Sequence, residues 1–148
     1  MEIKAKRDEL LATLYWTQSI VERRNTMPIL GNVLIEAQKG SVRVTATDLE
    51  VGVRGSVDAE VVKEGTVTVN AKKIYEIIRE VPNEQVQLKR LDNDWVEIRS
   101  GKSVFKIVGM DAKEFPQFPK FDAKSLSSTP AATVHEMIER TIFSVSMD

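Results

Sequence analysis

Two carboxylates stand two residues apart, the spacing of a possible general acid/base pair. If Asp48 and Glu50 lie on extended backbone, both side chains share one face, and their repulsion raises one pKa, as acid catalysis requires. No nucleophile or metal-ligand cluster is identifiable around them, and an Asp at this point fits turn chemistry equally well. The turn is the preferred interpretation. An enzyme that uses Asp48, Glu50 and Lys102 together stays open as an alternative.

A second candidate is a Gly-Lys-Ser sequence at residues 101–103, which ends like a phosphate-binding P-loop. That motif needs a glycine five positions earlier, where this chain has Val96. The sequence also lies between two strand patterns, where Gly101 would serve a turn. We therefore predict a hairpin and no nucleotide site.

Other chemistry is limited by residue types. The chain has no Cys and a single His, which excludes thiolate metal sites, disulfides, a cysteine nucleophile and multi-His metal sites. His135 has no Ser, Asp or His partner at a diagnostic spacing. Trp16 and Trp95 are interpreted as packing residues, because neither belongs to a repeated aromatic platform. The sequence thus predicts no catalytic residue, no metal site and no cofactor.

Composition indicates a globular protein. The 148 residues carry 21 basic and 22 acidic side chains, a net charge of −1, and 42% apolar residues. No apolar run approaches the roughly 18 residues that span a bilayer, and no export signal follows Met1. We expect a cytoplasmic protein with no membrane partner. The net charge argues against coating nucleic acid through bulk positive charge, but it allows a local basic face.

Basic residues are unevenly placed along the chain. Residues 72–90 hold five basic and three acidic side chains, whereas residues 41–70 hold three basic and five acidic ones. The pair Lys72-Lys73 stands at the start of a predicted helix, where cations oppose the helix dipole by a few tenths of a kcal/mol. Such a placement suggests an external anion. Ordinary solvated charge is the alternative that charge patterning leaves open.

Short strands run into amphipathic helices at three places. Apolar residues recur with the helical period in helices that begin near Arg7, Lys72 and Ala132. Pro82 ends the second of these helices, and Pro130 precedes the third. Strand-like alternation follows the first two helices, in segments 42–47, 51–57, 86–89, 96–99 and 105–108. The resulting order is β-α-β-β-β, twice, which suits two halves of one pseudo-symmetric domain.

The third unit is incomplete in this sequence. Residues 111–128 contain two prolines and little periodicity, as a linker does. A third helix then follows from near Thr129, but no strands follow it before Asp148. We expect a chain that stops in the middle of a repeat.

Several strings together resemble the bacterial beta sliding clamp family, the processivity subunit of DNA polymerase III. They occur in the family's order and spacing, and residues 129–148 resemble the start of that family's second domain. The strings are Arg24–Leu34 (RNTMPILGNVL), Thr45–Glu50 (TATDLE), Val69–Lys73 (VNAKK), Val96–Ser103 (VEIRSGKS) and Glu114–Pro116 (EFP).

The resemblance implies an α+β DNA-clamp fold, a pseudo-two-fold pair of β-α-β-β-β units with two helices on one face of antiparallel sheets. It also implies a non-catalytic homodimeric ring that encircles duplex DNA, is served by clamp-loader subunits and tethers DNA polymerase III. The expected domains are a clamp N-terminal domain at 1–120, a linker at 121–128 and a truncated second domain at 129–148. The family's peptide-binding pocket and ring-closing surface would lie beyond residue 148.

The resemblance also assigns candidate site residues. Arg24, Lys72 and Lys73 match the family's DNA-facing basic residues, although the family commonly has Arg at the position of Lys72, so bidentate phosphate contact is lost there. Arg7 and Arg23 are added on an inferred exposure alone. A strand with Phe105 and Ile107 matches the family's subunit interface, and a core role for both residues stays open. A stand-alone, sequence-nonspecific DNA-binding module is the alternative function.

Overall fold

The computed structural model describes residues 1–21, 27–117 and 127–146. The chain divides into two compact units, Met1–Gln117 and Phe118–Asp148. All strands among the described residues belong to the first unit. Arg23, Arg24 and most of the expected linker at 121–128 lie outside the described residues.

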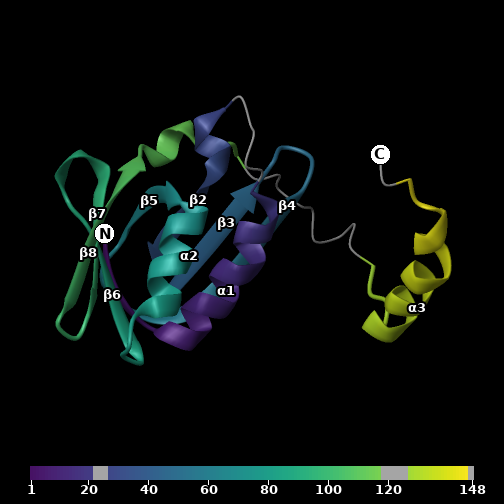
Figure 1. Ribbon diagram of the computed structural model, residues 1–148, viewed down its shortest axis with the longest axis horizontal. Coiled ribbons are helices and arrows are strands. Elements are labelled where there is room, and N and C mark those ends of the chain that lie inside the picture. The colour runs from purple at the N-terminus through teal and green to yellow at the C-terminus, as the bar shows by residue number, and fades with distance from the viewer. Residues whose placement is uncertain (22–26, 118–126, 147–148) are drawn as a thin grey trace. The chain divides into compact units, whose positions relative to one another are not determined.

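The first unit consists of two halves with the same order of elements (Figure 1). The first half contains β1 (Glu2–Lys6), α1 (Arg7–Ile20), β2 (Asn32–Gln38), β3 (Ser41–Thr47) and β4 (Gly52–Lys63). The second half contains β5 (Gly65–Asn70), α2 (Ala71–Glu80), β6 (Gln85–Arg90), β7 (Trp95–Ser100) and β8 (Ser103–Met110). Short 3₁₀ turns occur at Pro28–Gly31, Asp92–Asp94 and Ala112–Glu114. The predicted doubled β-α-β-β-β order is confirmed.

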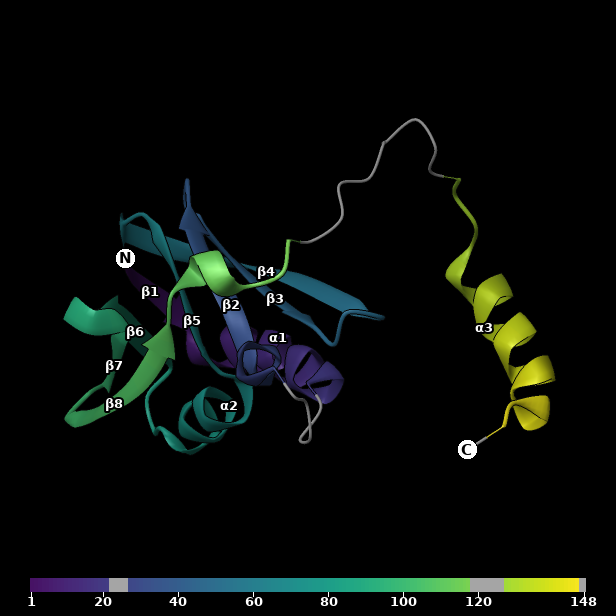
Figure 2. The same cartoon turned by 90° about the horizontal axis from the view of Figure 1, so that it is seen from above.

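The eight strands pair in a closed antiparallel order, β1-β4-β3-β2-β5-β8-β7-β6. Each half contributes four neighbouring strands, and the halves meet where β2 pairs with β5 and β1 pairs with β6. These two seams are equivalent, because exchanging the halves converts one into the other. Helices α1 and α2 lie side by side on the same side of the strands (Figures 1 and 2). The expected α+β architecture, with two helices on one face of antiparallel strands, is thereby confirmed.

Strand β2 is not predicted by the sequence pattern, because its apolar and polar residues do not alternate. Its Val33, Leu34 and Ile35 are consecutive apolar residues. Val33 and Ile35 belong to the main core, whereas Leu34 packs on a second, smaller cluster that contains Ile29 and Phe115. A strand covered on both faces has no reason to alternate.

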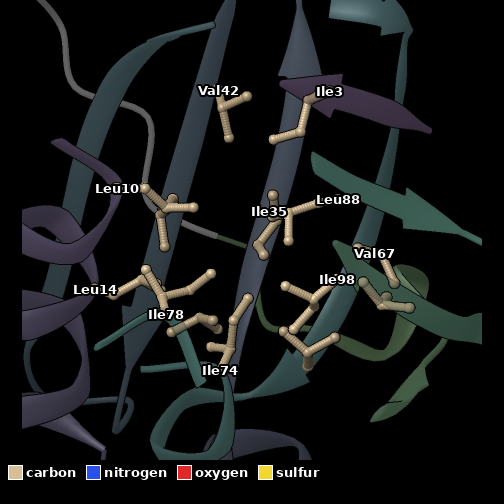
Figure 3. Packing of buried hydrophobic residues seen from close by; sticks show 14 of the residues in the cluster. Ile3, Leu10, Leu14, Ile35, Val42, Val67, Ile74, Ile78, Leu88 and Ile98 are labelled. Atoms are coloured by element: carbon tan, nitrogen blue, oxygen red, sulfur yellow. The ribbon is translucent and has the colours of Figure 1, made fainter. Parts of the chain in front are cut away.

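The main core is shared by both helices and both halves. Leu10 and Leu14 of α1 and Ile74 and Ile78 of α2 are fully buried. They meet strand residues from the two halves in one cluster (Figure 3), including Ile35, Val42, Val67, Leu88 and Ile98. Because burial of such side chains is worth roughly 1.5–3 kcal/mol each, this cluster fixes the rotation of both helices.

The second unit contains the predicted third helix, α3 (Ala131–Thr141), followed by a 3₁₀ turn at Ile142–Ser144. It lies one residue earlier than the sequence pattern indicates. Its apolar stripe is exposed in the described part of this unit, at Val134, Met137, Ile138 and Ile142.

The close approach of β8 to β5, within the second half, can be tested at Gly109 in β8. A Cβ atom added there would collide with the carbonyl oxygen of Thr68 and lie 2.7 Å from that of Asp94. Since both are backbone atoms, we expect Gly109→Ala to lower the free energy of unfolding by about 2 kcal/mol in urea titrations. Gly31→Ala is the control, because its Cβ would meet only Asn70 Nδ2 at 3.9 Å within the described structure. Equal stability of the two variants would contradict this packing.

Candidate nucleic-acid interface

Helices α1 and α2, which together are called the helix layer below, run antiparallel. At one end Arg7, the first residue of α1, donates from its backbone N–H to the Glu84 carbonyl oxygen at 2.7 Å, just beyond the end of α2. At the other end the last turn of α1 lies beside the first turn of α2. The two turns border a hollow of about 550 Å³ lined by Gln18, Ser19, Val21, Gly31, Asn70, Ala71 and Lys72. The basic pair therefore stands at one end of the helix layer.

Lys72 and Lys73 both project into solvent from the first turn of α2. Asn70 caps this helix, because its Oδ1 accepts the Lys73 backbone N–H at 3.0 Å. The Lys72 Nζ lies 3.7 Å from the Glu76 carboxylate one turn later. An exposed pair of this kind contributes about 0–1 kcal/mol, which is comparable with the unfavourable dipole term, and it exchanges readily with another anion. Both side chains are thus exposed to anions that approach this end of the layer.

Arg7 lies at the opposite end of the helix pair. Its guanidinium donates to the Val81 carbonyl oxygen at 3.0 Å and to the Asp8 carboxylate at 2.8–2.9 Å. It thus satisfies a carbonyl at the end of α2. The structure does not bring Arg7 together with Lys72 and Lys73, and its contact with DNA stays a prediction.

The structure exposes both tryptophans that the sequence interpretation assigned to packing: Trp16 lies on the outer side of α1, away from the core, and Trp95 begins β7. The prediction that Trp16 and Trp95 are packing residues is wrong, because their exposed fractions are 66% and 43%. A signal was available for Trp16. It stands two positions after Leu14, and residues two apart on a helix do not share a face. With Leu14 in the core, Trp16 points outward.

Strand β8 carries the two candidate interface residues. Residues 103–108 pair with β7, and contact with β5 is confined, among the described residues, to Gly109 and Met110. Most of the second edge of β8 is therefore open to another strand. Ile107 packs partly on the core, whereas Phe105 is 39% exposed. The two residues therefore differ in burial, and their role at an interface stays a prediction.

The carboxylate pair occurs in the turn between β3 and β4. Asp48 Oδ1 accepts the backbone N–H of Glu50 at 2.9 Å and of Val51 at 2.6 Å. The bond from Val51, reinforced by that from Glu50, lowers the pKa of the Asp48 carboxyl below its usual range. Lys102 lies in the β7–β8 turn on the opposite side of this unit (Figures 1 and 2). The turn interpretation is confirmed, and the three-residue enzyme site does not assemble.

The Gly-Lys-Ser sequence forms the predicted hairpin. Ser100 pairs with Ser103 across the β7–β8 turn, and Gly101 has a φ of 58°, a left-handed conformation that glycine adopts without strain. Among the residues that the structure describes, no group of three or more His, Asp or Glu side chains is placed to hold a metal ion. The helices among those same residues are too short or too polar to span a bilayer.

Comparison with known proteins identifies the family. The family described as the DNA polymerase III beta subunit, N-terminal domain, matches residues 1–119. The chain belongs to this family. The strings quoted from residues 24–116 therefore reflect a true relationship, and the doubled β-α-β-β-β unit with its helix layer is a clamp N-terminal domain.

Similar proteins extend the match over the rest of the chain. The beta sliding clamp of Chlamydia pneumoniae is 29% identical over 148 residues, and that of Vibrio cholerae is 32% identical over 147. A DNA polymerase sliding clamp structure from Caulobacter crescentus, 32% identical, superposes with a TM-score of 0.89. These alignments cover 99–100% of this chain. The chain spans only 40% of the length of each of the three proteins.

The pKa of the Asp48 carboxyl distinguishes a structural turn from an acid/base site. We expect the Asp48 carboxyl to titrate below the usual range for Asp in an NMR-monitored pH titration, because two backbone N–H groups stabilise the carboxylate. Since the folded-state pKa is lowered, the stabilisation by this turn is present above the unfolded pKa and is lost as the pH falls through the folded value. A raised pKa would instead indicate a coupled carboxylate pair.

Proposed function

We propose that this chain is the DNA-encircling N-terminal part of a sliding clamp, a processivity factor without catalytic activity of its own. In the complete protein, two such subunits close a ring around duplex DNA and tether DNA polymerase III. The observation that carries the proposal is a family match over residues 1–119 on a domain with an exposed basic pair at one end of its helix layer. That layer is the surface that would face the DNA.

Weak phosphate contacts fit such a role. A closed ring is held on DNA by topology, so its inner face needs only sequence-independent attraction that does not stop sliding. Each lysine that neutralises a phosphate releases counterions and makes the attraction salt-dependent. Lys72 and Lys73 supply such contacts, and Arg24 is proposed to add another, with Arg23 and Arg7 as further candidates. A net charge of −1 suits a protein that slides rather than coats.

The remaining assignments follow from the same proposal. Residues 1–120 form the clamp N-terminal domain, residues 121–128 are the linker, and residues 129–148 begin the second domain. The partners are duplex DNA, the polymerase and the clamp loader, and the compartment is the cytoplasm. The pocket for partner peptides belongs to other domains of the complete protein.

Strand β8 is proposed to form the subunit interface. Its open edge can accept a strand from the partner subunit, which satisfies its backbone N–H and C=O groups. The exposed Phe105 would then be buried against that partner, and Ile107 would support it from the core side.

Charge reversal tests the DNA-facing surface. In a full-length clamp that begins with this sequence, we expect Lys72→Glu with Lys73→Glu to shorten retention on linear DNA, where sliding leads to loss at the ends. The slope of log retention against log salt should fall by about one for each lost phosphate contact. Adding Arg24→Glu should extend the effect.

The matched control carries Lys39→Glu and Lys63→Glu. These two lysines lie near one end of the β2–β5 pair, and the first turn of α2 follows the opposite end. Retention on closed circular DNA should be preserved in all variants, because topology holds the ring there. If the Lys72/Lys73 variant and the control behaved alike on linear DNA, these lysines would not face DNA.

The interface proposal is tested at Phe105. We expect Phe105→Asp in the full-length clamp to weaken dimerisation by roughly 100-fold in sedimentation experiments, because an unpaired carboxylate would be buried. Val62→Asp is the control, since Val62 is an exposed valine of β4 with an exposed fraction of 54%. Ile107 is a poorer test site, because it also packs on the core. An unchanged dimer would remove Phe105 from the interface.

A further inference from the structure

We propose that Trp16, supported by Tyr15 and Tyr75, is a stacking platform for unpaired bases, so that the helix layer binds single-stranded DNA as well as duplex. This inference rests on the proposed function, because it places the platform on the surface that would face DNA. It adds a second kind of contact, made through base faces, to the phosphate contacts of the lysines.

The platform bridges the two helices. Tyr15 and Trp16 are adjacent on α1, with ring centroids 5.6 Å apart and an interplanar angle of 75°. Tyr15 also contacts Tyr75 of α2, with centroids 6.2 Å apart and an angle of 47°. Tyr75 is partly buried on the core, which anchors the group, while Tyr15 and Trp16 are 51% and 66% exposed. The most exposed ring is thus held by less exposed neighbours.

Positive charges border these rings. The Arg79 guanidinium lies 5.8 Å from the centre of the Tyr75 ring. Lys72 precedes Tyr75 by three positions and Arg79 follows it by four, so both lie on the same side of α2 as the ring. Lys72 and Arg79 are therefore separated by roughly 10 Å along the helix axis. Two cations flanking an aromatic group match a strand in which charged phosphates alternate with flat bases.

The acidic neighbours of Lys72 and Arg79 do not prevent these cations from binding another anion. Lys72 pairs with Glu76 at 3.7 Å and Arg79 pairs with Glu80 at 2.9 Å. The side chains of both pairs are about half exposed or more, and such ion pairs exchange readily with another anion. This combination of exposed rings and exchangeable cations favours a nucleic acid over a purely apolar protein surface.

Stacking of this kind is compatible with sliding. Every base has a π-face, so an aromatic platform binds single strands without regard to sequence. The faces of paired bases are hidden in the duplex stack, and the platform would engage only where bases are unpaired. The helix layer would then hold single-stranded stretches more firmly than duplex.

The chain's two tryptophans make a direct test possible. In the 148-residue chain, Trp95→Phe leaves Trp16 as the only tryptophan, and Trp16→Phe leaves Trp95 as the internal control. We expect oligo(dT) at low salt to quench Trp16 fluorescence and to leave Trp95 unchanged. Anisotropy of labelled oligo(dT) should show about tenfold weaker binding for Trp16→Ala, with Trp95→Ala as the matched control. Because Trp16 is largely exposed, the variant should keep its circular dichroism spectrum.

A duplex hairpin of equal charge, closed by a base-free linker so that all its bases are paired, separates this inference from the proposed function. Quenching of Trp16 by oligo(dT) but not by the hairpin supports the platform. Equal quenching by both, or none by either, overturns it. If Trp16 is silent while Lys72→Glu with Lys73→Glu still weakens binding of the hairpin, only the platform fails. If those lysine changes also have no effect, the DNA-facing assignment of the helix layer fails with it.

Discussion

The pairing of β1 with β6 and of β2 with β5 is the constraint on which the rest of this domain depends. Each half leaves strands β1 and β2, or β5 and β6, with backbone groups that only the other half satisfies. Closing both seams removes those edges and places the two helices next to each other. The halves are therefore interdependent parts of one folding unit, although their element orders are the same.

Closure of the two seams gives the helix layer one buried face and one exposed face. Leu10 and Leu14, like Ile74 and Ile78, are drawn into the core that the seams enclose. Their burial leaves Trp16 on the outer side and exposes the first turn of α2 next to the last turn of α1. A surface with basic residues at one end and aromatic rings nearby is thus produced by packing on the opposite face. Substitutions of the exposed residues Trp16, Lys72 and Lys73 on this side therefore leave the core contacts in place.

Under the proposed function, the same placement would let a nearly neutral domain bind nucleic acid. Strong, fixed phosphate contacts would anchor a ring, whereas a few exposed lysines provide attraction that exchanges quickly and responds to salt. Lys72 and Lys73 stand where the helix dipole already disfavours them, so a phosphate bound there, as proposed, would relieve an existing repulsion. In the proposed platform, the exposed aromatic side chains would add an interaction that depends on base stacking and not on charge.

Residue order alone specified much of this molecule. Helical and strand periodicities located α1, α2, α3 and most strands, Gly101 marked the β7–β8 hairpin, and Asp48 marked the β3–β4 turn. The family strings identified the clamp relationship, because closely related folds keep similar local sequences at the same turns and helix starts. These features depend on neighbours a few residues away. Strand β2 escaped, because burial of both faces removes the alternation that reveals a strand.

Tertiary structure decided what depends on contacts between distant segments. Only packing shows that Phe105 is exposed while Ile107 reaches the core, since both have the same apolar character and spacing on β8. Only packing joins Tyr15 to Tyr75, which are far apart in the chain and meet because the closed sheet sets α1 against α2. Periodicity tells which side of a helix is apolar. Which helix lies beside it, and which side chains then share its outer surface, is set by the free energy of burying both helices in one core.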